Sequence, residues 1–325
     1  MDVLPEFELI RPTSLNEVVA ARRQHPGSRL LGGGTDLIVN IRRGIGEEPP
    51  ALIDMNNVAE LKTIAADAHS LTIGASVTIA EVARHPAIIE HYPAIAEAAA
   101  EIAGPTHRLM GTVGGNLCLD TRCIYYNQSD WWRSANNYCL KFRGAQCHVA
   151  PKSKVCFATF SGDLAPALMI YSAEVDLAGP DGVRTVPVAD LYSGDGQNYL
   201  TLRDGEIVAT VRLSSVAGLR TAYDKVRVRQ SIDYPLAGVA VGVSRDGDVL
   251  TDLRIAITGT NPRPVLLAGT DALHGSGLNE ALFEKVDELV RDQIMAMKTT
   301  FTPGHYRRRV AGVLARRLIE GLFAA

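Results

Sequence analysis

Four of the five cysteines in this chain lie in one segment, at Cys123, Cys139, Cys147 and Cys156. Thiolates gathered in a chain that is otherwise poor in cysteine indicate a metal centre, because free thiolates are soft metal ligands. The intervals are 15, 7 and 8 residues. They contain neither the Cys-x-x-Cys pairs of zinc ribbons nor the run of a bacterial ferredoxin. Spacing alone therefore leaves the metal open.

Two glycine-rich stretches precede the cysteine-containing segment in the sequence. They are Gly32-Gly33-Gly34-Thr35-Asp36 and Gly111-Thr112-Val113-Gly114-Gly115-Asn116. Glycine lets backbone N–H groups approach a ligand closely, and arrays of such groups bind phosphate oxygens. Neither stretch has the Rossmann or the Walker spacing. A tight strand-to-helix turn is the alternative for the first stretch alone. Two such loops in neighbouring units favour a diphosphate lying between them.

Regular elements must hold these loops in place. The strand-like run Arg29-Leu30-Leu31 leads into the first glycine stretch, and residues 37–43 have a helical pattern. A second unit begins near Leu61, with a helix expected at 94–102 before the second stretch. A third unit begins near Thr221, with strands, a hairpin signal at Asp246-Gly247 and two amphipathic helices at the C-terminal end.

Composition limits the possible functions. The chain has 325 residues, so two or three domains are expected. It is 46% apolar and 21% charged with a net charge of −3, which is ordinary for a soluble protein and gives no reason to expect nucleic acid or an anionic membrane as partner. No secretory signal and no long apolar run is visible, so a cytoplasmic location is expected.

Several motifs resemble those of the flavin subunits of the xanthine oxidase family. Leu31 to Leu37 resembles the first FAD loop of that family, Gly111 to Asn116 resembles the second, and Asp163-Leu164-Ala165-Pro166-Ala167-Leu168 resembles the stretch that follows. The resemblance continues through 223–226, 235–240 and 306–309, so it covers nearly the whole chain apart from one insertion.

The resemblance implies an α+β fold: a two-part FAD-binding domain of the xanthine oxidase/vanillyl-alcohol oxidase type, followed by a small α+β C-terminal domain. The expected boundaries are 1–219, with subdomains of about 1–58 and 59–219, and 220–325. The residues it implies for FAD are Arg29, Leu30, Leu31, Gly32, Gly33, Gly34, Thr35, Asp36, Gly111, Thr112, Val113, Gly114, Gly115, Asn116, Asp163 and Lys225. Lys225 is equally open to interpretation as a solvated strand lysine. No catalytic residue is predicted on this chain.

An insertion of residues 119–160 separates Asn116 from Asp163 by 47 positions (163 − 116), whereas only a short stretch separates the matching residues in most of the family. Between 121 and 160 there are six basic residues and one acid, Asp130. Irregular gaps suit a wide [4Fe–4S] cluster, basic residues offset the charge of its thiolates, and the aromatic side chains there exclude water. These three points favour a cluster over a structural zinc.

The insertion resembles that of the flavin subunits of 4-hydroxybenzoyl-CoA reductases, through 117–123, 126–129, 131–134 and 138–141. That resemblance implies a [4Fe–4S] cluster on Cys123, Cys139, Cys147 and Cys156. Cys118 is interpreted as a small buried residue, and its replacing Cys123 as a ligand is the alternative. His148 is expected beside the site and not as a ligand.

The function that the resemblance implies is an electron-transfer subunit. A low-potential donor such as ferredoxin would supply electrons through [4Fe–4S] and FAD toward a molybdopterin subunit and a small [2Fe–2S] subunit, in a dimer of heterotrimers. The reaction would be the reductive dehydroxylation of 4-hydroxybenzoyl-CoA to benzoyl-CoA, in anaerobic aromatic degradation. The alternatives are a related hydroxylase with another substrate, an FAD oxidase with a structural zinc, and a cysteine-rich binding module.

Two further groups are weighed on their residues alone. His107, just before the second glycine stretch, is expected to be a hydrogen-bonding loop residue and not a catalytic base. The run Arg307-Arg308-Arg309 is expected to be a solvated helix face, with a contact to a partner subunit as the alternative.

Overall fold

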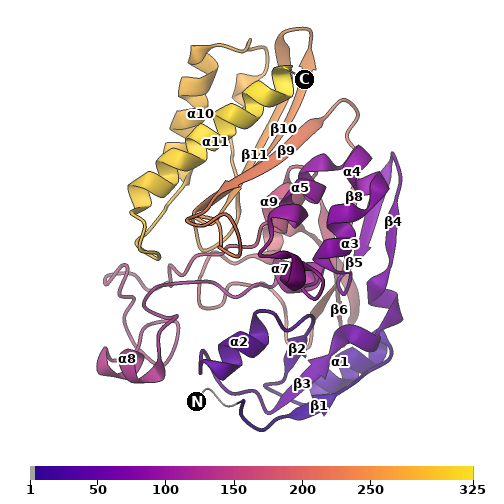
Figure 1. Cartoon of the computed structure of the whole chain (residues 1–325), viewed down its shortest axis with the longest axis vertical. Coiled ribbons are helices and arrows are strands. Elements are labelled where there is room, and N and C mark those ends of the chain that lie inside the picture. The colour runs from indigo at the N-terminus through magenta and orange to yellow at the C-terminus, as the bar shows by residue number, and fades with distance from the viewer. Residues whose placement is uncertain (1–3, 325) are drawn as a thin grey trace.

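Three β-sheets follow one another along the chain and divide it into three layered parts (Figure 1). The computed structural model describes residues 4–324. The N-terminal sheet is parallel with strand order β1-β3-β2, the central sheet is β4-β5-β8-β6-β7, and the C-terminal sheet is β12-β11-β10-β9. This mixture of helices and sheets confirms the predicted α+β class.

The N-terminal part consists of β1 (Glu8–Ile10), α1 (Leu15–Gln24), β2 (Arg29–Leu31), α2 (Leu37–Arg42) and β3 (Ala51–Asp54). Its small core joins Val18 of α1 and Ile53 of β3 to Ile207 and Ala209 of the central sheet. The parallel pairing of β2 with β3 places the first glycine loop at the C-terminal edge of this sheet.

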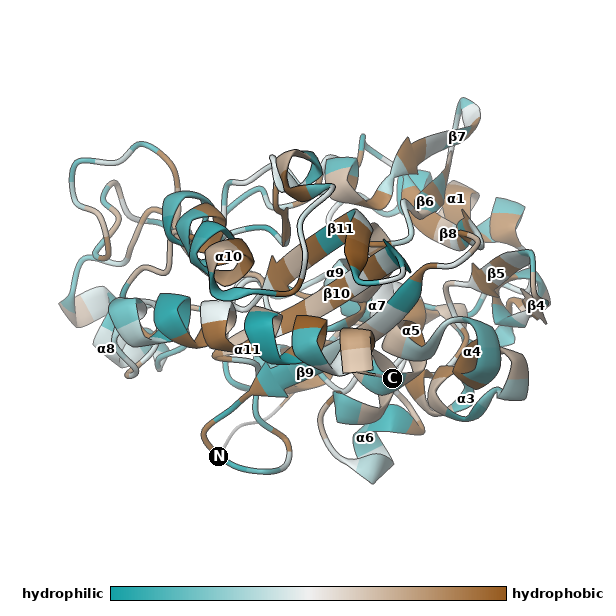
Figure 2. Ribbon diagram, turned by 90° about the horizontal axis from the view of Figure 1, so that it is seen from above, coloured by the Kyte–Doolittle hydropathy of each residue, from teal (hydrophilic) through white to brown (hydrophobic). Residues whose placement is uncertain are grey.

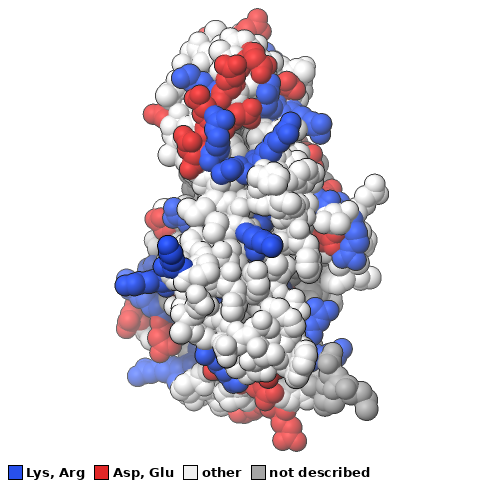
Figure 3. All heavy atoms as spheres, turned by 90° about the vertical axis from the view of Figure 1, so that its left-hand side faces the viewer, with Lys and Arg blue, Asp and Glu red and all other residues white. Residues whose placement is uncertain are grey.

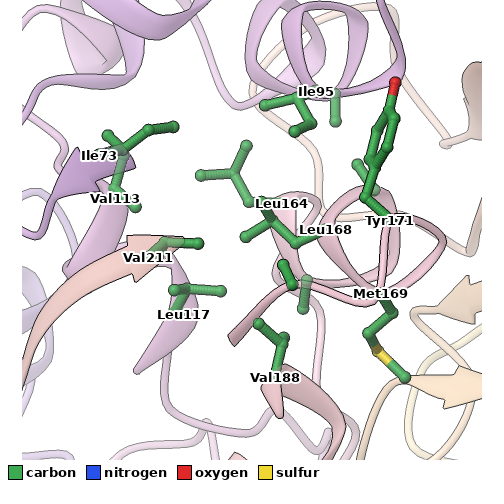
Figure 4. Packing of buried hydrophobic residues seen from close by; sticks show 14 of the residues in the cluster. Ile73, Ile95, Val113, Leu117, Leu164, Leu168, Met169, Tyr171, Val188 and Val211 are labelled. Carbon is green, nitrogen blue, oxygen red and sulfur yellow. The ribbon is translucent and has the colours of Figure 1, made fainter. Parts of the chain in front are cut away.

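The central part carries the largest core. Its strands are β4 (Ile64–Ala66), β5 (Ser70–Gly74), β6 (Glu174–Gly179), β7 (Gly182–Pro187) and β8 (Ile207–Ser214). Its helices are α3 (Ile79–Arg84), α4 (Pro86–His91), α5 (Pro93–Glu101), α6 (Pro105–Arg108), α7 (Val113–Leu117) and α9 (Leu164–Met169). Val113 and Leu117 of α7 point into this core beside Leu164 and Leu168 of α9 (Figure 4), so packing anchors the second glycine loop.

The C-terminal part consists of β9 (Arg220–Val226), β10 (Ala237–Asp246), β11 (Val249–Thr258), β12 (Val265–Leu266), α10 (Glu280–Gln293) and α11 (Gly304–Ala324). Helices α10 and α11 cover one face of the apolar sheet (Figure 2), and α5 and α9 pack on its other face. The β10–β11 hairpin turns at Gly247-Asp248, one residue later than the predicted signal, because Asp246 still pairs with Val249.

The insertion is mostly irregular and projects from the side of the molecule, with one short helix, α8 (Asp130–Ala135) (Figure 1). Four 3₁₀ turns complete the elements, at Met55–Asn57, Ala59–Lys62, Val188–Leu191 and Thr270–Leu273. Within residues 4–324 no helix is both long and apolar enough to cross a membrane.

Candidate functional site

The two glycine loops touch each other. A Cβ placed on Gly33 would lie 1.7 Å from the carbonyl oxygen of Met110, and one on Gly32 would lie 2.7 Å from the hydroxyl oxygen of Thr112. Gly34 has a φ of +69°, in the left-handed region. Position 33 therefore needs glycine because the two loops approach closely there, and position 34 needs glycine because of its left-handed turn.

The two loops differ in the hydrogen-bonding groups they leave free. Among the described residues, the backbone N–H groups of Gly33, Gly34 and Thr35 donate to no acceptor. In the second loop, by contrast, the N–H of Gly114 donates to Ala75 at 2.8 Å and that of Gly115 to the Thr112 hydroxyl at 3.2 Å. The first loop therefore offers free N–H donors, while the second contributes mainly side chains and a close-fitting wall.

A cavity of about 580 Å³ opens between these loops. Most of the residues predicted for FAD line it, namely Arg29, Leu30, Gly32, Gly33, Gly34, Thr35, Asp36, Gly111, Thr112, Gly114, Gly115, Asn116 and Asp163. Three predicted residues do not. Leu31 lies against Gly34, Val113 points into the core, and Lys225 is buried behind Asp163.

Asp163 connects this cavity to the C-terminal part. Its Oδ1 accepts a hydrogen bond of 2.6 Å from the Tyr223 hydroxyl and lies 3.0 Å from Lys225 Nζ. Tyr223 and Lys225 lie two residues apart on the same face of β9. The Lys225 side chain is 0% exposed, so Lys225 is neither solvated nor part of the cavity wall. Burial, reinforced by the Asp163 charge, raises the pKa of Tyr223 well above its ordinary value.

The insertion leaves the chain and returns to it at one place. Arg122 and Thr159 exchange two backbone hydrogen bonds of 2.7 Å, forming an antiparallel bridge at its base. Just outside the bridge, the Asn116 side chain accepts a hydrogen bond of 3.0 Å from the backbone N–H of Leu164. The two ends of the motif that the insertion divides in sequence are thus adjacent in space.

Arg122 also ties the insertion to the first glycine loop. Its guanidinium forms an ion pair with Asp36 and donates to Asn40 at 3.1 Å and to the Tyr234 hydroxyl at 2.9 Å. Tyr234, from the C-terminal part, donates in turn to Asp36 at 3.0 Å. Three segments that are distant in sequence therefore share one polar network in the cavity wall.

All four predicted metal ligands line a second, smaller cavity inside the insertion. Cys123, Cys139, Cys147 and Cys156 are each at most 8% exposed, and no disulfide joins them. The remaining wall consists of Tyr125, Tyr126, Leu140, Lys141, His148, Val149 and Ala158. Residues separated by up to 33 positions (156 − 123) thus converge on one space.

The four thiols line one cavity but are not grouped as a metal site. In residues 4–324, no three His, Cys, Asp or Glu side chains are grouped so as to hold a metal ion. Burial raises the pKa of Cys123 to about 11, and the nearby Cys139 and Cys147 thiols add to that rise. Burial raises the pKa of Cys156 to about 12, against the opposing charge of Lys141.

Two of the insertion's six basic residues lie inside it. The side chains of Arg133 and Lys141 are 2% and 5% exposed, whereas Arg143, Lys152 and Lys154 face solvent. The guanidinium of Arg133 lies 5.0 Å from the centre of the Phe142 ring. The face that carries the insertion shows separate Lys and Arg side chains on a largely uncharged middle, not one basic patch (Figure 3).

Other predicted residues have mixed outcomes. Nε2 of His148 lies 2.5 Å from the Tyr138 carbonyl oxygen, beside the cysteines as expected. Cys118 lines the large cavity and not the cysteine cavity. His107 lies in the short helix α6 and not in a loop. Its backbone carbonyl accepts from the Gly111 N–H at 2.6 Å, while its buried Nδ1 has no partner among the described residues.

The interpretation of Arg307 as a solvated residue was wrong. Its side chain is fully buried and donates to the Leu236 carbonyl at 3.1 Å, the Met297 carbonyl at 3.1 Å and the Thr299 hydroxyl at 3.0 Å. Arg308 and Arg309 are exposed, as expected. Burial lowers the pKa of Arg307 to about 10. Its polar partners are backbone carbonyls and the Thr299 hydroxyl, which only the tertiary fold brings together.

Sequence reasoning missed part of the large cavity's wall, notably Arg43, Asp120, Arg122, Tyr126, Tyr199 and Tyr234. Asp120 and Arg122 lie within a stretch that the resemblance had marked, which was an available signal. Tyr199 and Tyr234 are single aromatic residues in loops, and no local pattern identifies them.

Comparison with known proteins identifies the family. Residues 5–214 match the model of the FAD binding domain in molybdopterin dehydrogenase, and residues 221–322 match the CO dehydrogenase flavoprotein C-terminal domain. The chain belongs to the FAD-binding subunits of the xanthine oxidase family of molybdenum hydroxylases, of the CO dehydrogenase medium-chain type. It is therefore an oxidoreductase subunit with an FAD-binding domain.

Its relatives match over nearly their whole length. The aldehyde oxidoreductase FAD-binding subunit PaoB of Escherichia coli K12 is 30% identical, over 95% of this chain and 97% of PaoB. The carbon monoxide dehydrogenase medium chain of Hydrogenophaga pseudoflava is 27% identical, over 98% of each chain. Reconstituted CO dehydrogenase from Oligotropha carboxidovorans has the same fold, with a TM-score of 0.81, 24% identity and 99% of each chain covered.

Proposed function

We propose that this chain is an electron-transfer subunit of a molybdenum enzyme that holds FAD between its glycine loops and a [4Fe–4S] cluster in its insertion. One observation carries the proposal: Cys123, Cys139, Cys147 and Cys156 are buried around a single cavity. The flavin part rests on the family to which the chain belongs.

FAD fits the large cavity on structural grounds. The free N–H groups of Gly33, Gly34 and Thr35 are suited to diphosphate oxygens, and Arg29 and Arg43 supply positive charge in the same wall. We propose that the predicted residues lining the cavity hold FAD, with Asp163 positioned by Lys225. The separate sheets and cores of the central and C-terminal parts support a division of the chain into domains at 1–219 and 220–325.

A [4Fe–4S] cluster fits the cysteine cavity better than zinc does. A single zinc ion needs its thiolate sulfurs about 2.3 Å from one point. A cluster of four irons holds four thiolates farther apart. The buried charges of Lys141 and Arg133 and the surrounding aromatic rings suit a centre that carries net negative charge.

When bound, the cluster would supply one-electron transfer, and FAD would supply the change between one- and two-electron steps. The chain's own residues position these groups and exclude water. Arg122, next to Cys123 at the base of the insertion, pairs with Asp36 in the wall of the flavin cavity. Tyr126 and Phe142 shield the thiols from solvent, since both are at most 9% exposed.

We further propose that a molybdopterin subunit and a small [2Fe–2S] subunit complete the enzyme in the cytoplasm, and that a low-potential donor of the ferredoxin type supplies electrons. The resemblance of the insertion supports a 4-hydroxybenzoyl-CoA reductase, in which this subunit serves the reductive removal of an aromatic hydroxyl group. The substrate would bind on another chain.

Analysis of anaerobically prepared protein for iron, acid-labile sulfide, zinc and flavin tests the proposal. We expect about four irons and four sulfides per chain, together with FAD. Cys139→Ser should abolish the cluster absorbance while FAD stays bound, and Cys118→Ser, at the cysteine outside the cysteine cavity, serves as the matched control that keeps the cluster. Zinc without sulfide, or a full cluster in Cys139→Ser, would overturn the assignment.

A hydroxylase that passes electrons outward is the second candidate, favoured by the 30% identity to the FAD-binding subunit of an aldehyde oxidoreductase. Copurification of the assembly from native cells, followed by two assays, separates the candidates. Reduction of 4-hydroxybenzoyl-CoA by a low-potential dye supports the first. Oxidation of aldehydes with an added electron acceptor, and no dehydroxylation, supports the second.

A further inference from the structure

A thin wall separates the cysteine cavity from the flavin cavity. Tyr126 belongs to the lining of both. Lys141 lines the cysteine cavity, while Asp120 and Tyr199 line the flavin cavity. The Lys141 ammonium lies 5.0 Å from the centre of the Tyr126 ring and 5.4 Å from that of Tyr199. The Lys141 cation therefore lies in this wall, between the rings of Tyr126 and Tyr199.

Lys141 is held rigidly. Its Nζ lies 2.9 Å from Asp120 Oδ1, 2.7 Å from the Thr121 hydroxyl oxygen and 2.6 Å from the Gly196 carbonyl oxygen. An ammonium group has three donors, so all of them are used. The Lys141 side chain is 5% exposed and that of Asp120 is 19% exposed. Solvent therefore screens this charge far less than it screens a surface lysine.

The ion pair has a direction. Its positive end lies in the wall of the cysteine cavity and its negative end in the wall of the flavin cavity. In surroundings of low dielectric, adding an electron is more favourable near the positive end of an ion pair than near its negative end. The pair therefore biases electrons toward the cysteine cavity.

We propose that Lys141 raises the reduction potential of the cluster, by placing a buried positive charge in the wall between the two cofactor cavities. The proposal rests on the proposed function. One-electron reduction by a low-potential donor would make a cluster held there one unit more negative and would require no proton. The Lys141 charge stabilises this reduced state more than the oxidised one. Lys141 is thus a positioning and tuning residue, not a catalytic one.

The test is a potentiometric titration of the full-length, anaerobically prepared chain, with the reduced cluster followed by electron paramagnetic resonance. Lys141→Met should lower the ratio of reduced to oxidised cluster at the wild-type midpoint about tenfold, which is ~59 mV for a one-electron couple. Asp120→Asn should move the midpoint in the opposite direction, because it removes the negative end of the pair.

The matched control is Lys152→Met, which removes the same charge from an exposed position of the insertion. Its midpoint should equal that of the wild type. Midpoint potentials that shift in opposite directions in Lys141→Met and Asp120→Asn support the proposal. A general loosening of the site would not make the direction of the shift depend on the sign of the charge that was removed.

Two results would overturn it, and they are distinguishable. Wild-type protein that contains no iron or sulfide would remove the proposed cluster and this inference together. A cluster whose midpoint is unchanged in both variants would remove the inference alone. If Lys141→Met fails to retain the cluster, Asp120→Asn decides, since it leaves the ammonium and two of its hydrogen bonds in place.

Discussion

At the scale of single residues, this structure contains buried charged side chains that are held by hydrogen bonds. Asp163, Lys225 and Tyr223 form a closed group in which one carboxylate oxygen accepts from two partners. A Cβ on Gly238 would lie 2.3 Å from the Tyr223 hydroxyl oxygen, so glycine at that position makes room for the group. Breaking a buried pair costs more than the pair contributes, because the remaining charge loses its partner.

Lys225→Met should therefore lower the free energy of unfolding by about 3–5 kcal/mol and reduce FAD content. Arg212→Met is the matched control, because Arg212 pairs with Asp176 but has a side chain that is 47% exposed. It should cost about 0–1 kcal/mol. Urea unfolding followed by circular dichroism measures both, and equal losses would contradict the role given to the buried pair.

Glu206 predicts a specific dependence on pH. The hydrogen bond from Arg184, 2.6 Å long, lowers the pKa of Glu206 below its ordinary 4.5, against the opposing effect of burial, and the Arg203 backbone N–H and charge also lower it. Because the folded pKa lies below the unfolded one, the ionised carboxylate stabilises the fold above about pH 4.5, and this contribution is lost as pH falls through the folded pKa.

Glu206→Gln should accordingly lower the unfolding free energy at pH 7 by about 1.5–3 kcal/mol. The difference from the wild type should narrow as the pH falls below 4.5. Thermal unfolding at several pH values measures it, with the exposed Glu284→Gln on α10 as control. A difference that is constant with pH would show that Arg184 does not act on this carboxylate.

At the scale of elements, the strand β2 and the short helix α7 set the relation of the two glycine loops. Helix α7 is capped by Thr112 and anchored by Val113 and Leu117 in the central core. The chain before α7 then presses against Gly33. The flavin cavity therefore depends on the absence of a side chain at one contact.

Gly33→Ala should separate the loops and lose most of the bound FAD, because its Cβ would overlap the Met110 carbonyl at 1.7 Å. Overpacking of this kind costs about 1–3 kcal/mol. Gly321→Ala in α11 is the control, since nothing lies within 4 Å of its Cβ. It should retain FAD, and flavin absorbance per chain is the measurement. Full occupancy in Gly33→Ala would contradict the loop geometry.

At the scale of the whole molecule, the C-terminal part holds both cavities in place. Its β9 supplies Lys225 and Tyr223, the loop before β10 supplies Tyr234, and the loop before α11 supplies Thr299. The Thr299 carbonyl accepts from the Ile124 backbone N–H at 2.9 Å, and its hydroxyl lies 2.6 Å from that of Thr159. The insertion is thus braced by a domain far from it in sequence.

Arg307 fixes that bracing loop from behind, so Arg307→Met should reduce the stability together with the iron content that the proposed cluster would give. Each buried acceptor left without a partner costs about 1–3 kcal/mol. Arg308→Met, one residue along on the exposed face of α11, is the control and should behave like the wild type. Iron analysis and thermal unfolding measure the two effects, and a stable variant with full iron would contradict the bracing role.

The sequence by itself determined what depends on local pattern. Glycine stretches, the alternation of β9 and the helical periodicity of α10 are properties of neighbouring residues and indicated local elements. The α+β class and the FAD-binding family were indicated by the resemblance of the motifs, and the clustered cysteines indicated a metal centre. Substrate and partners remain proposals, because they depend on surfaces of other chains.

Only the tertiary structure decided which side chains meet. The ion pair of Arg122 with Asp36, the burial of Arg307 and the place of Tyr126 in both cavity walls join segments that are far apart in the chain. From sequence alone, charged side chains are predicted to be solvated, because most of them are exposed in folded proteins. Whether a lysine such as Lys141 faces water or a cavity is set by how the loops close over it, and no local pattern encodes that closure.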